Sequence, residues 1–196
     1  MGERAEYRSA IRSRRLIREA FLSILQERGI SKMTVTEIVK RADINRATFY
    51  AHFPDVQGII DEMENEVIGK VFDLLKPEDH GNFLDDLPTL FVNINSYINE
   101  NIDSFRILVK VNESFTFIEK MKKILVDFMM EYEAIPETVR SGEQYHLSCI
   151  YFVGGVMSLY KSWLLGEVDC SLEMIADQCE PMLSIFTSAY LDKQKN

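Results

Sequence analysis

The chain has 196 residues, of which 46% are hydrophobic, and this is enough apolar material for one large domain or two small ones. No apolar run is long enough to span a bilayer, the charged N-terminus lacks the apolar segment of a secretory signal, and the three cysteines show no Cys-x-x-Cys spacing. These features argue against membrane-spanning and disulfide-stabilised classes, and we expect a cytoplasmic protein with reduced thiols.

The net charge of −9 is distributed unevenly along the chain. Residues 1–60 hold 11 Lys/Arg against 7 Asp/Glu, a net charge of +4, whereas residues 61–196 hold 11 against 24, a net charge of −13. This asymmetry favours a basic module that faces nucleic acid, joined to an acidic body. Chance clustering of surface arginines in a helical protein is the alternative.

Helical periodicity dominates the chain, which has no internal repeat and no useful run of β-type alternation. The first helix is predicted from about Arg12 to Arg28, because its apolar residues form one stripe at helical spacing. Gly29 is expected to end this helix, since glycine readily adopts the conformation that follows a last helical turn.

Residues 34–53 contain two short helical patterns that meet at a polar turn. Thr34 and Glu37 have the spacing of a capping box at the start of the first pattern, and Asn45 is suited to cap the second. The second helix exposes four hydrogen-bonding side chains, Arg46, Thr48, Tyr50 and His52. This arrangement predicts a helix-turn-helix whose second helix enters the major groove of DNA, with an ordinary solvated helix face as the alternative.

The remaining residues are predicted to form a larger helical body. The expected helices cover about 55–76, 88–101 with Pro88 in the first turn, 103–109, a segment from 112 or 114 to 129, 141–165 and 171–193. Ser141 and Gln144 form a possible capping box, and residues 134–142 are predicted to be a loop. We therefore predict an all-α protein of about nine helices, with a helix-turn-helix DNA-binding domain at 1–54 and a regulatory and dimerisation domain at 55–196.

The last two predicted helices are apolar over more of their circumference than the others. We expect them to pair with the same two helices of a second subunit as a four-helix bundle, which makes the protein a homodimer. The expected interface residues are Gly154, Gly155, Trp163, Leu172, Cys179, Leu183 and Phe186. Burial of both helices against their own chain is the alternative.

Residues 12–68 resemble the DNA-binding domain of the TetR family of transcriptional regulators. The resemblance rests on Thr34-Val35-Thr36-Glu37-Ile38, Ala42, Ile44-Asn45-Arg46, Thr48-Phe49-Tyr50 and His52-Phe53, which keep both residue type and spacing. It implies that Arg46 and Thr48 reach base edges or nearby phosphates, and that Tyr50 and His52 hold phosphates. It also implies phosphate contacts for Thr34 and Thr36. Asn45 and Arg15 complete the predicted DNA-binding set.

This chain departs from the family pattern at two positions. Asp43 stands where many members have glycine, and Val56 stands where many have a lysine that meets a phosphate. Both changes weaken the attraction to DNA, so we expect moderate binding that depends steeply on salt. Arg14, Arg15 and Arg18 of the first helix are candidates to compensate.

A second resemblance covers part of the body. The residues Tyr151-Phe152-Val153-Gly154-Gly155-Val156, Trp163-Leu164, Gly166, Ser171 and Met174 are similar to a TetR-like subgroup that includes regulators of dihydroxyacetone kinase operons. The family resemblance implies an unknown small-molecule inducer held in the body. The aromatic candidates for its pocket are Phe91, Tyr97, Phe105, Phe115, Phe128 and Tyr151, although aromatics at helical spacing are more often core residues.

The sequence gives little support to catalysis. The three histidines His52, His80 and His146 lack metal-ligand spacing, and the chain has no phosphate-cradling loop and no nucleophile elbow. We expect no enzyme activity, no metal and no cofactor. The predicted function is a TetR-like regulator, expected to be a repressor, that binds a near-palindromic double-stranded DNA operator and leaves it when the inducer binds. A coregulator of the same fold that docks a partner protein instead of DNA is the alternative.

Overall fold

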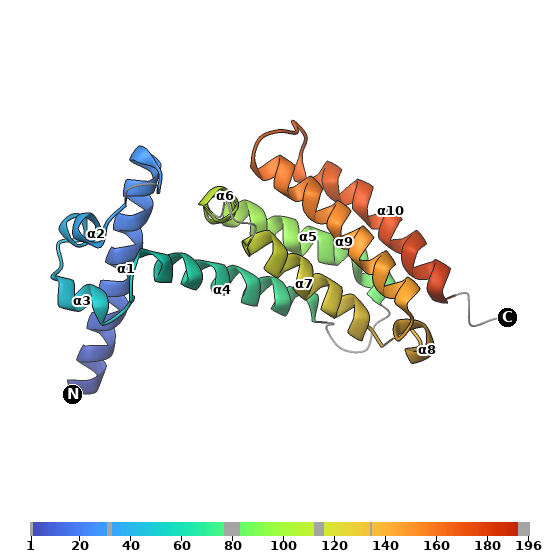
Figure 1. The fold of residues 1–196 in the computed structure, drawn as a ribbon, viewed down its shortest axis with the longest axis horizontal. Helices are drawn as coiled ribbons and strands as arrows, with labels where there is room; N and C mark the ends of the chain where they lie inside the picture. Colours follow the sequence, from blue (N-terminus) through green and yellow to red (C-terminus); the bar gives the residue numbers. More distant parts are fainter. Residues whose placement is uncertain (1, 31–32, 77–82, 112–115, 134, 192–196) are drawn as a thin grey trace. The chain divides into compact units, whose positions relative to one another are not determined.

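The structure is a computed structural model that describes residues 2–30, 33–76, 83–111, 116–133 and 135–191. All regular structure within these ranges is helical (Figure 1). The helices are α1 (Gly2–Arg28), α2 (Val35–Arg41), α3 (Arg46–Tyr50), α4 (Val56–Leu75), α5 (Phe83–Glu100), α6 (Ile102–Val111), α7 (Thr116–Glu131), α8 (Glu137–Arg140), α9 (Glu143–Leu164) and α10 (Leu172–Leu191). The prediction of an all-α protein is confirmed, with ten helices in the described ranges instead of about nine.

The chain divides into two compact units, residues 1–65, here called the head, and residues 66–196, here called the body. The division falls inside α4, so this helix begins in the head and ends in the body. The boundary predicted between residues 54 and 55 lies at the start of that helix.

The head is built from α1, α2, α3 and the first part of α4. Ile17 and Phe21 of α1, Ile38 of α2 and Phe49 of α3 are each 0% exposed and form its centre. Gly29 has a φ of +76°, and its N–H donates to the carbonyl of Leu25, 2.9 Å away, so this glycine ends α1 as predicted.

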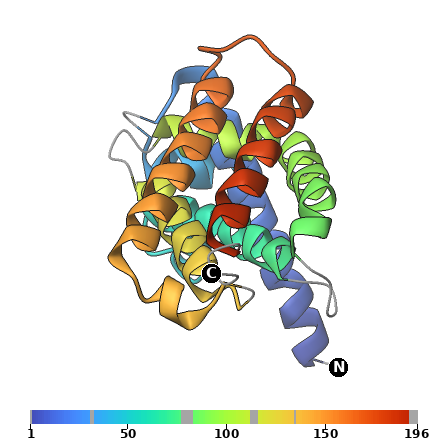
Figure 2. The same cartoon turned by 90° about the vertical axis from the view of Figure 1, so that its right-hand side faces the viewer.

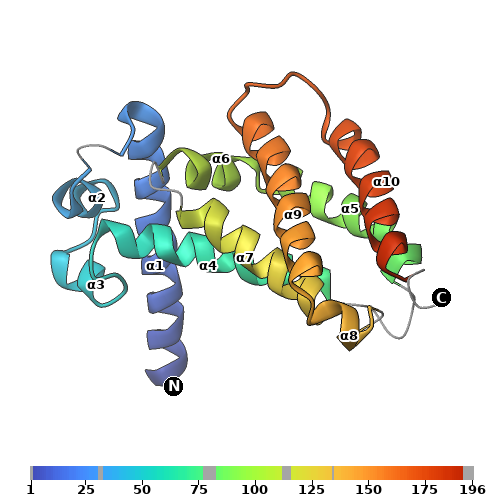
Figure 3. The same cartoon turned by 45° about the vertical axis from the view of Figure 1, so that its right-hand side comes forward.

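In the body, α9 packs mainly on α7, and α10 packs mainly on α5. The helices α9 and α10 also contact each other and lie side by side, as Figures 2 and 3 show. No helix within the described ranges is both long enough and apolar enough to cross a membrane.

Two helix starts in the body differ from prediction. Pro88 is exposed and lies inside α5, which begins at Phe83, so the proline removes one hydrogen bond of this helix instead of starting it. A one-turn helix, α8, occupies part of the predicted loop, and Ser141 ends it by donating its N–H to the Glu137 carbonyl. Ser141 therefore cannot start α9, whose N-cap is Gly142 without a side-chain hydrogen bond, and the predicted capping box with Gln144 is wrong.

Candidate nucleic-acid interface and body cavity

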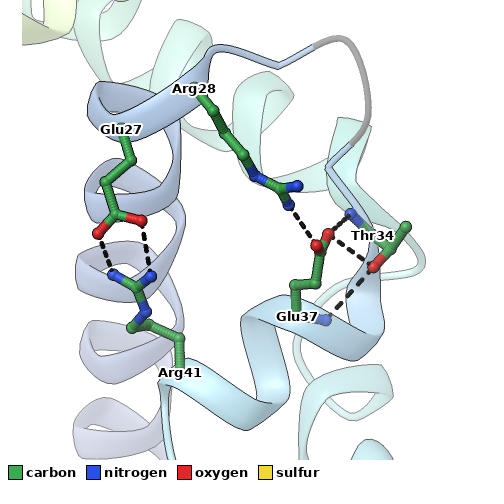
Figure 4. A network of polar contacts seen from close by, with 5 residues as sticks. All are labelled: Glu27, Arg28, Thr34, Glu37 and Arg41. Carbon is green, nitrogen blue, oxygen red and sulfur yellow. Dashed lines mark hydrogen bonds and ion pairs between the residues drawn. The ribbon is translucent and has the colours of Figure 1, made fainter.

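The start of α2 is fixed by the predicted capping box (Figure 4). The Glu37 N–H donates to Thr34 Oγ1 at 3.3 Å, and the Thr34 N–H and hydroxyl donate to Glu37 Oε2 at 3.0 and 2.9 Å. These bonds satisfy donors that a helix start otherwise leaves to water. They also engage the Thr34 hydroxyl proton within the head.

Two ion pairs join α2 to α1, and both are drawn in Figure 4. Arg28 pairs with Glu37, while Arg41 forms a bidentate pair with Glu27, at 2.6 and 2.8 Å. The hydrogen bond from Arg28 holds the pKa of Glu37 below its usual value, with Thr34 adding to the effect. The hydrogen bond from Arg41 lowers the pKa of Glu27 in the same way. Both carboxylates therefore favour the charged form that braces α2.

The turn between α2 and α3 contains a residue in a left-handed conformation. Asp43 has a φ of +53°, and the next residue, Ile44, donates its N–H to the Val39 carbonyl at 3.1 Å. This bond pattern closes a helix end and favours glycine at the left-handed position. The backbone thus gives a physical reason for the glycine found here in many family members, and it identifies Asp43 as a strained substitute.

Asn45 caps α3, as predicted. Its Oδ1 accepts hydrogen bonds from the Thr48 N–H at 2.7 Å and from the Thr48 hydroxyl at 3.0 Å. Phe49 anchors the helix, and the edge of its ring meets the neighbouring Tyr50, which is 54% exposed. His52 is half-buried, with its ring next to that of Phe53.

Arg46 lies at the first turn of α3 and is exposed. Its Nη2 donates to the hydroxyl of Thr36 in α2 at 2.7 Å, so the structure brings together two predicted DNA-binding residues that are ten positions apart. This bond holds an arginine, the side chain that most often reads guanine, at the exposed surface of the predicted recognition helix.

The arginines of α1 differ in their surroundings. Arg15 is exposed and lies 3.6 Å from Glu19 on the same helix. Arg14 instead pairs with Glu62 of α4 at 3.1 Å and lies over the ring of Phe53. Arg14 therefore joins α1 to the elements that follow α3, and it is a poor candidate to compensate for Asp43 and Val56.

The body contains a partly open cavity of about 120 Å³ that is lined by residues of α4, α5, α6, α7, α9 and α10. Of the predicted pocket aromatics, Phe91, Phe105 and Phe128 line this cavity. Tyr97 is not among the lining residues and packs edge-on against Phe105, whereas Tyr151 is 86% exposed, so the prediction is wrong for Tyr151. Phe115 lies outside the described residues.

Most residues of the cavity wall were not predicted from the sequence. The unpredicted residues are mainly aliphatic side chains and methionines, such as Leu125 of α7 and Val156 and Met157 of α9. Their helical spacing marks them as buried residues, but spacing alone does not distinguish a packed core from the wall of a cavity.

Several residues predicted to form a dimer interface are buried within the chain itself. Leu172, Cys179 and Leu183 are 2%, 1% and 7% exposed, because this stripe of α10 faces the rest of the body. Trp163 donates its indole N–H to the Cys170 carbonyl at 2.8 Å, and Phe186 stacks against Tyr145 and Phe152. The three buried residues are therefore removed from the interface prediction, whereas Gly154 is half-buried and Gly155 exposed.

The described ranges give little support to a metal site. No group of three His, Cys, Asp or Glu side chains in them could hold a metal ion. His146 is exposed, and His80 lies outside the described residues.

Comparisons with known proteins agree with this architecture. Residues 17–63 match the family described as bacterial regulatory proteins, tetR family, and residues 85–184 match the transcriptional regulator C-terminal region. The fold is similar to that of a TetR transcriptional regulator from Streptococcus agalactiae 2603V, with a TM-score of 0.65 and 21% identity over 92% of this chain and 98% of that one.

Two relatives from Bacillus subtilis (strain 168) match only part of the chain. The uncharacterized HTH-type transcriptional regulator YxbF is 29% identical over 69 residues, which are 35% of this chain and 18% of the relative. The uncharacterized HTH-type transcriptional regulator YvdT is 27% identical over 66 residues, which are 34% of each chain.

The comparisons favour a DNA-binding regulator over the partner-docking alternative, and family members are transcriptional regulators that bind DNA, not enzymes. The resemblance to regulators of dihydroxyacetone kinase operons stays a prediction, because the C-terminal match is described only as a transcriptional regulator region. The helix-turn-helix of the head and the helical body both match family models of these regulators, and together the matches cover most of the chain. The chain therefore belongs to the TetR family of transcriptional regulators.

Proposed function

We propose that the protein is a repressor that binds a near-palindromic DNA operator as a homodimer and leaves it when a small molecule occupies the body cavity. The observation that carries the DNA-binding part is the placement of Arg46 at the exposed start of α3, hydrogen-bonded to Thr36. Arginine there would donate to the O6 and N7 atoms of guanine. Thr36, Tyr50 and Arg15 would meet phosphates, which position the head without reading sequence.

The dimer part rests on an apolar face that other described residues leave exposed. It follows one side of α9 and one side of α10 and consists of Leu147, Ile150, Tyr151, Met174, Met182 and Ile185. Large exposed apolar surfaces mark interaction sites in proteins. A two-fold axis would bring α9 and α10 of two copies together as a four-helix bundle.

Gly154 and Gly155 support the same face. A Cβ atom added at either position would meet nothing within 4 Å among the described residues, so packing within the chain does not require these glycines. A glycine inside a helix costs about 1 kcal/mol relative to alanine. Close approach of a partner helix gives a reason for retaining two of them in the middle of α9.

The dimer proposal is tested by sedimentation velocity. Ile185→Asp places a charge in the apolar face and should convert a dimer to a monomer, because an unpaired charge is costly in a dry interface. Val92→Asp is the matched control, since Val92 is 62% exposed on α5 and outside this face. A wild-type monomer, or an Ile185→Asp variant that remains dimeric, would refute this face as the interface.

The inducer part rests on α4. Val71 and Leu75, near the end of this helix, line the body cavity, while residues of its first half belong to the head. We expect α4 to adopt more than one arrangement. A ligand would favour the arrangement whose cavity it binds more tightly, because only a difference in affinity between two conformations changes their populations.

DNA binding is tested by fluorescence anisotropy with the DNA upstream of the protein's own gene and with a shuffled sequence of equal length. We expect tighter binding to the upstream DNA and a steep fall in affinity as salt increases. Equal affinity for both sequences, or no salt dependence, would overturn the proposed function.

A further inference from the structure

The chemistry of the cavity wall restricts what the body can bind. Its lining residues are apolar or aromatic, and the wall exposes only apolar atoms. Phe117 and Leu125 of α7, Ile94 of α5 and Val156 of α9 are examples. Among the described residues, a ligand in this cavity would meet carbon and sulfur atoms, and none of the lining side chains carries a carboxylate, ammonium or guanidinium group.

Tyr160, the lining residue with a hydroxyl group, and Tyr145, which bonds to a lining residue, both have hydrogen-bond partners within the body. The hydroxyl of Tyr160 donates to Asn95 Oδ1 at 2.8 Å, and Asn95 Nδ2 donates to the Leu172 carbonyl at 2.9 Å. The hydroxyl of Tyr145 donates to the carbonyl of Met129, a lining residue, at 3.0 Å. The protons of these hydroxyl and amide groups are therefore already engaged, and a ligand could take them as donors only by breaking buried hydrogen bonds, which is unfavourable unless it replaces them.

The size of the cavity limits the ligand further. Its volume is about 120 Å³, close to the roughly 150 Å³ at which an apolar protein cavity stays dry and binds benzene. Because a water molecule needs two or more polar partners, this wall does not favour water. A single ring with one short substituent matches both the volume and the surface.

We infer that the body cavity binds an uncharged apolar molecule about the size of a monosubstituted benzene, without a hydrogen-bond anchor. A carboxylate or ammonium group would lose its water without gaining a partner, and the protein would exclude it. The ligand class follows from the cavity wall alone, and its role as inducer rests on the proposed function.

The test uses the full chain without DNA and three compounds that share one ring. Binding of 4-fluorotoluene, 4-fluorobenzoate and 4-fluorobenzylamine is followed by ¹⁹F NMR at neutral pH, where the last two are charged. We expect 4-fluorotoluene to bind with a Kd on the order of 0.1 mM and the charged compounds at least about a hundredfold more weakly. Binding of either charged compound as tight as that of 4-fluorotoluene, or no binding of 4-fluorotoluene, would overturn the inference.

Cavity-filling variants locate the bound compound. Val156→Phe and Ile94→Phe each add bulk to the wall, from α9 and α5, and should weaken 4-fluorotoluene binding about tenfold or more. Val92→Phe is the matched control, because it makes the same change at an exposed position of α5 and should bind normally. Circular dichroism shows whether each cavity-filling variant folds. If one of them does not fold, the binding measured for the other variant tests the inference. Unchanged binding in a folded filled variant would place the compound elsewhere and overturn the inference.

A separate measurement tests the inducer role. Anisotropy of the upstream DNA is repeated with 4-fluorotoluene at saturation of the wild-type protein. Loss of DNA binding in the wild type, but not in a folded cavity-filled variant, would support both the ligand class and the proposed function. Binding of 4-fluorotoluene without any effect on DNA would leave the ligand class intact and overturn the inducer role.

Discussion

In the head, Arg46 and Thr48, which are proposed to meet DNA, are held by hydrogen bonds at or near the surface, whereas the side chains around the body cavity are apolar or aromatic, buried or half-buried, and contributed by six helices. Arg46 owes its position to a hydrogen bond with Thr36, and Thr48 owes its position to the Asn45 cap. Phe91 and Phe128, by contrast, line the cavity only because α5 and α7 pack around the same space. A polar recognition surface thus depends on a few identifiable bonds, and an apolar cavity depends on the packing of the whole body.

The largest expected effect tests whether the head and the body are separable. Phe49→Ala removes a ring that is 0% exposed and should destabilise the head by about 3–5 kcal/mol. DNA binding should be lost, while binding of 4-fluorotoluene by the body persists. Urea unfolding is followed by circular dichroism for all helices and by fluorescence of Trp163, the single tryptophan, for the body. Tyr50→Ala, at the exposed neighbour, is the control for the stability of the head only, because Tyr50 is itself proposed to meet a phosphate. An equal loss in both signals would show that the two units unfold together.

The next prediction separates recognition of the base sequence from electrostatic attraction to any DNA. Arg46→Ala should reduce the preference for the upstream DNA over the shuffled DNA by about 1–3 kcal/mol, because it removes the proposed contact with a base. Arg15→Ala should weaken binding to both DNAs equally and reduce the salt slope by about 1, as loss of a phosphate contact does. Anisotropy titrations at several salt concentrations measure both quantities. If the two variants change the preference equally, Arg46 does not read a base.

A smaller effect is expected at the α2 cap. Thr34→Val removes the hydroxyl that accepts the Glu37 N–H and should destabilise the head by about 1 kcal/mol. Thr34→Ser keeps a hydroxyl and should stay close to the wild type. Urea unfolding followed by circular dichroism compares the two. Equal stability of the valine and serine variants would mean that the cap contributes little.

Asp43 offers a change in the stabilising direction. Asp43→Gly should stabilise the head by about 0.5–1 kcal/mol, because glycine adopts a φ near +53° without strain. It should also tighten binding to every DNA by removing a negative charge. Asp43→Asn removes the charge while keeping a side chain, so it separates the electrostatic effect from the backbone effect. A less stable glycine variant would refute the strain at this turn.

Alkaline pH should affect the body through its buried titratable groups. Burial raises the pKa of the Cys149 and Cys179 thiols above 9.0 and the pKa of the Tyr145 and Tyr160 phenols above 10.0, the usual values. The unfolded chain releases these protons first, so their contribution to stability is complete below about pH 9 and is lost as pH rises through the raised values. The urea midpoint of Trp163 fluorescence should therefore fall between about pH 8 and pH 10.5. A constant midpoint would contradict this assignment.

Local bonds explain which parts of the candidate site could be predicted. Thr34 with Glu37 and Asn45 with Thr48 are each three residues apart, and both caps form as their spacing indicates. The ion pair between Glu27 and Arg41 spans fourteen residues, and its existence depends on how α1 and α2 pack. Sequence spacing carries no information about such a contact.

The sequence by itself determined most of the helices, although not α8 or the start of α5, and it determined the helix-turn-helix with its caps, because caps, turns and helical periodicity act between residues a few positions apart. The tertiary structure decided which apolar stripes face inward. Leu172, Cys179 and Leu183 proved to be core residues, while Ile150 and Ile185 remained exposed. It also decided that apolar side chains from six helices leave a cavity between them. The reason is that hydrophobic burial has no direction: periodicity shows that a stripe must be covered, and only the packed helices show what covers it.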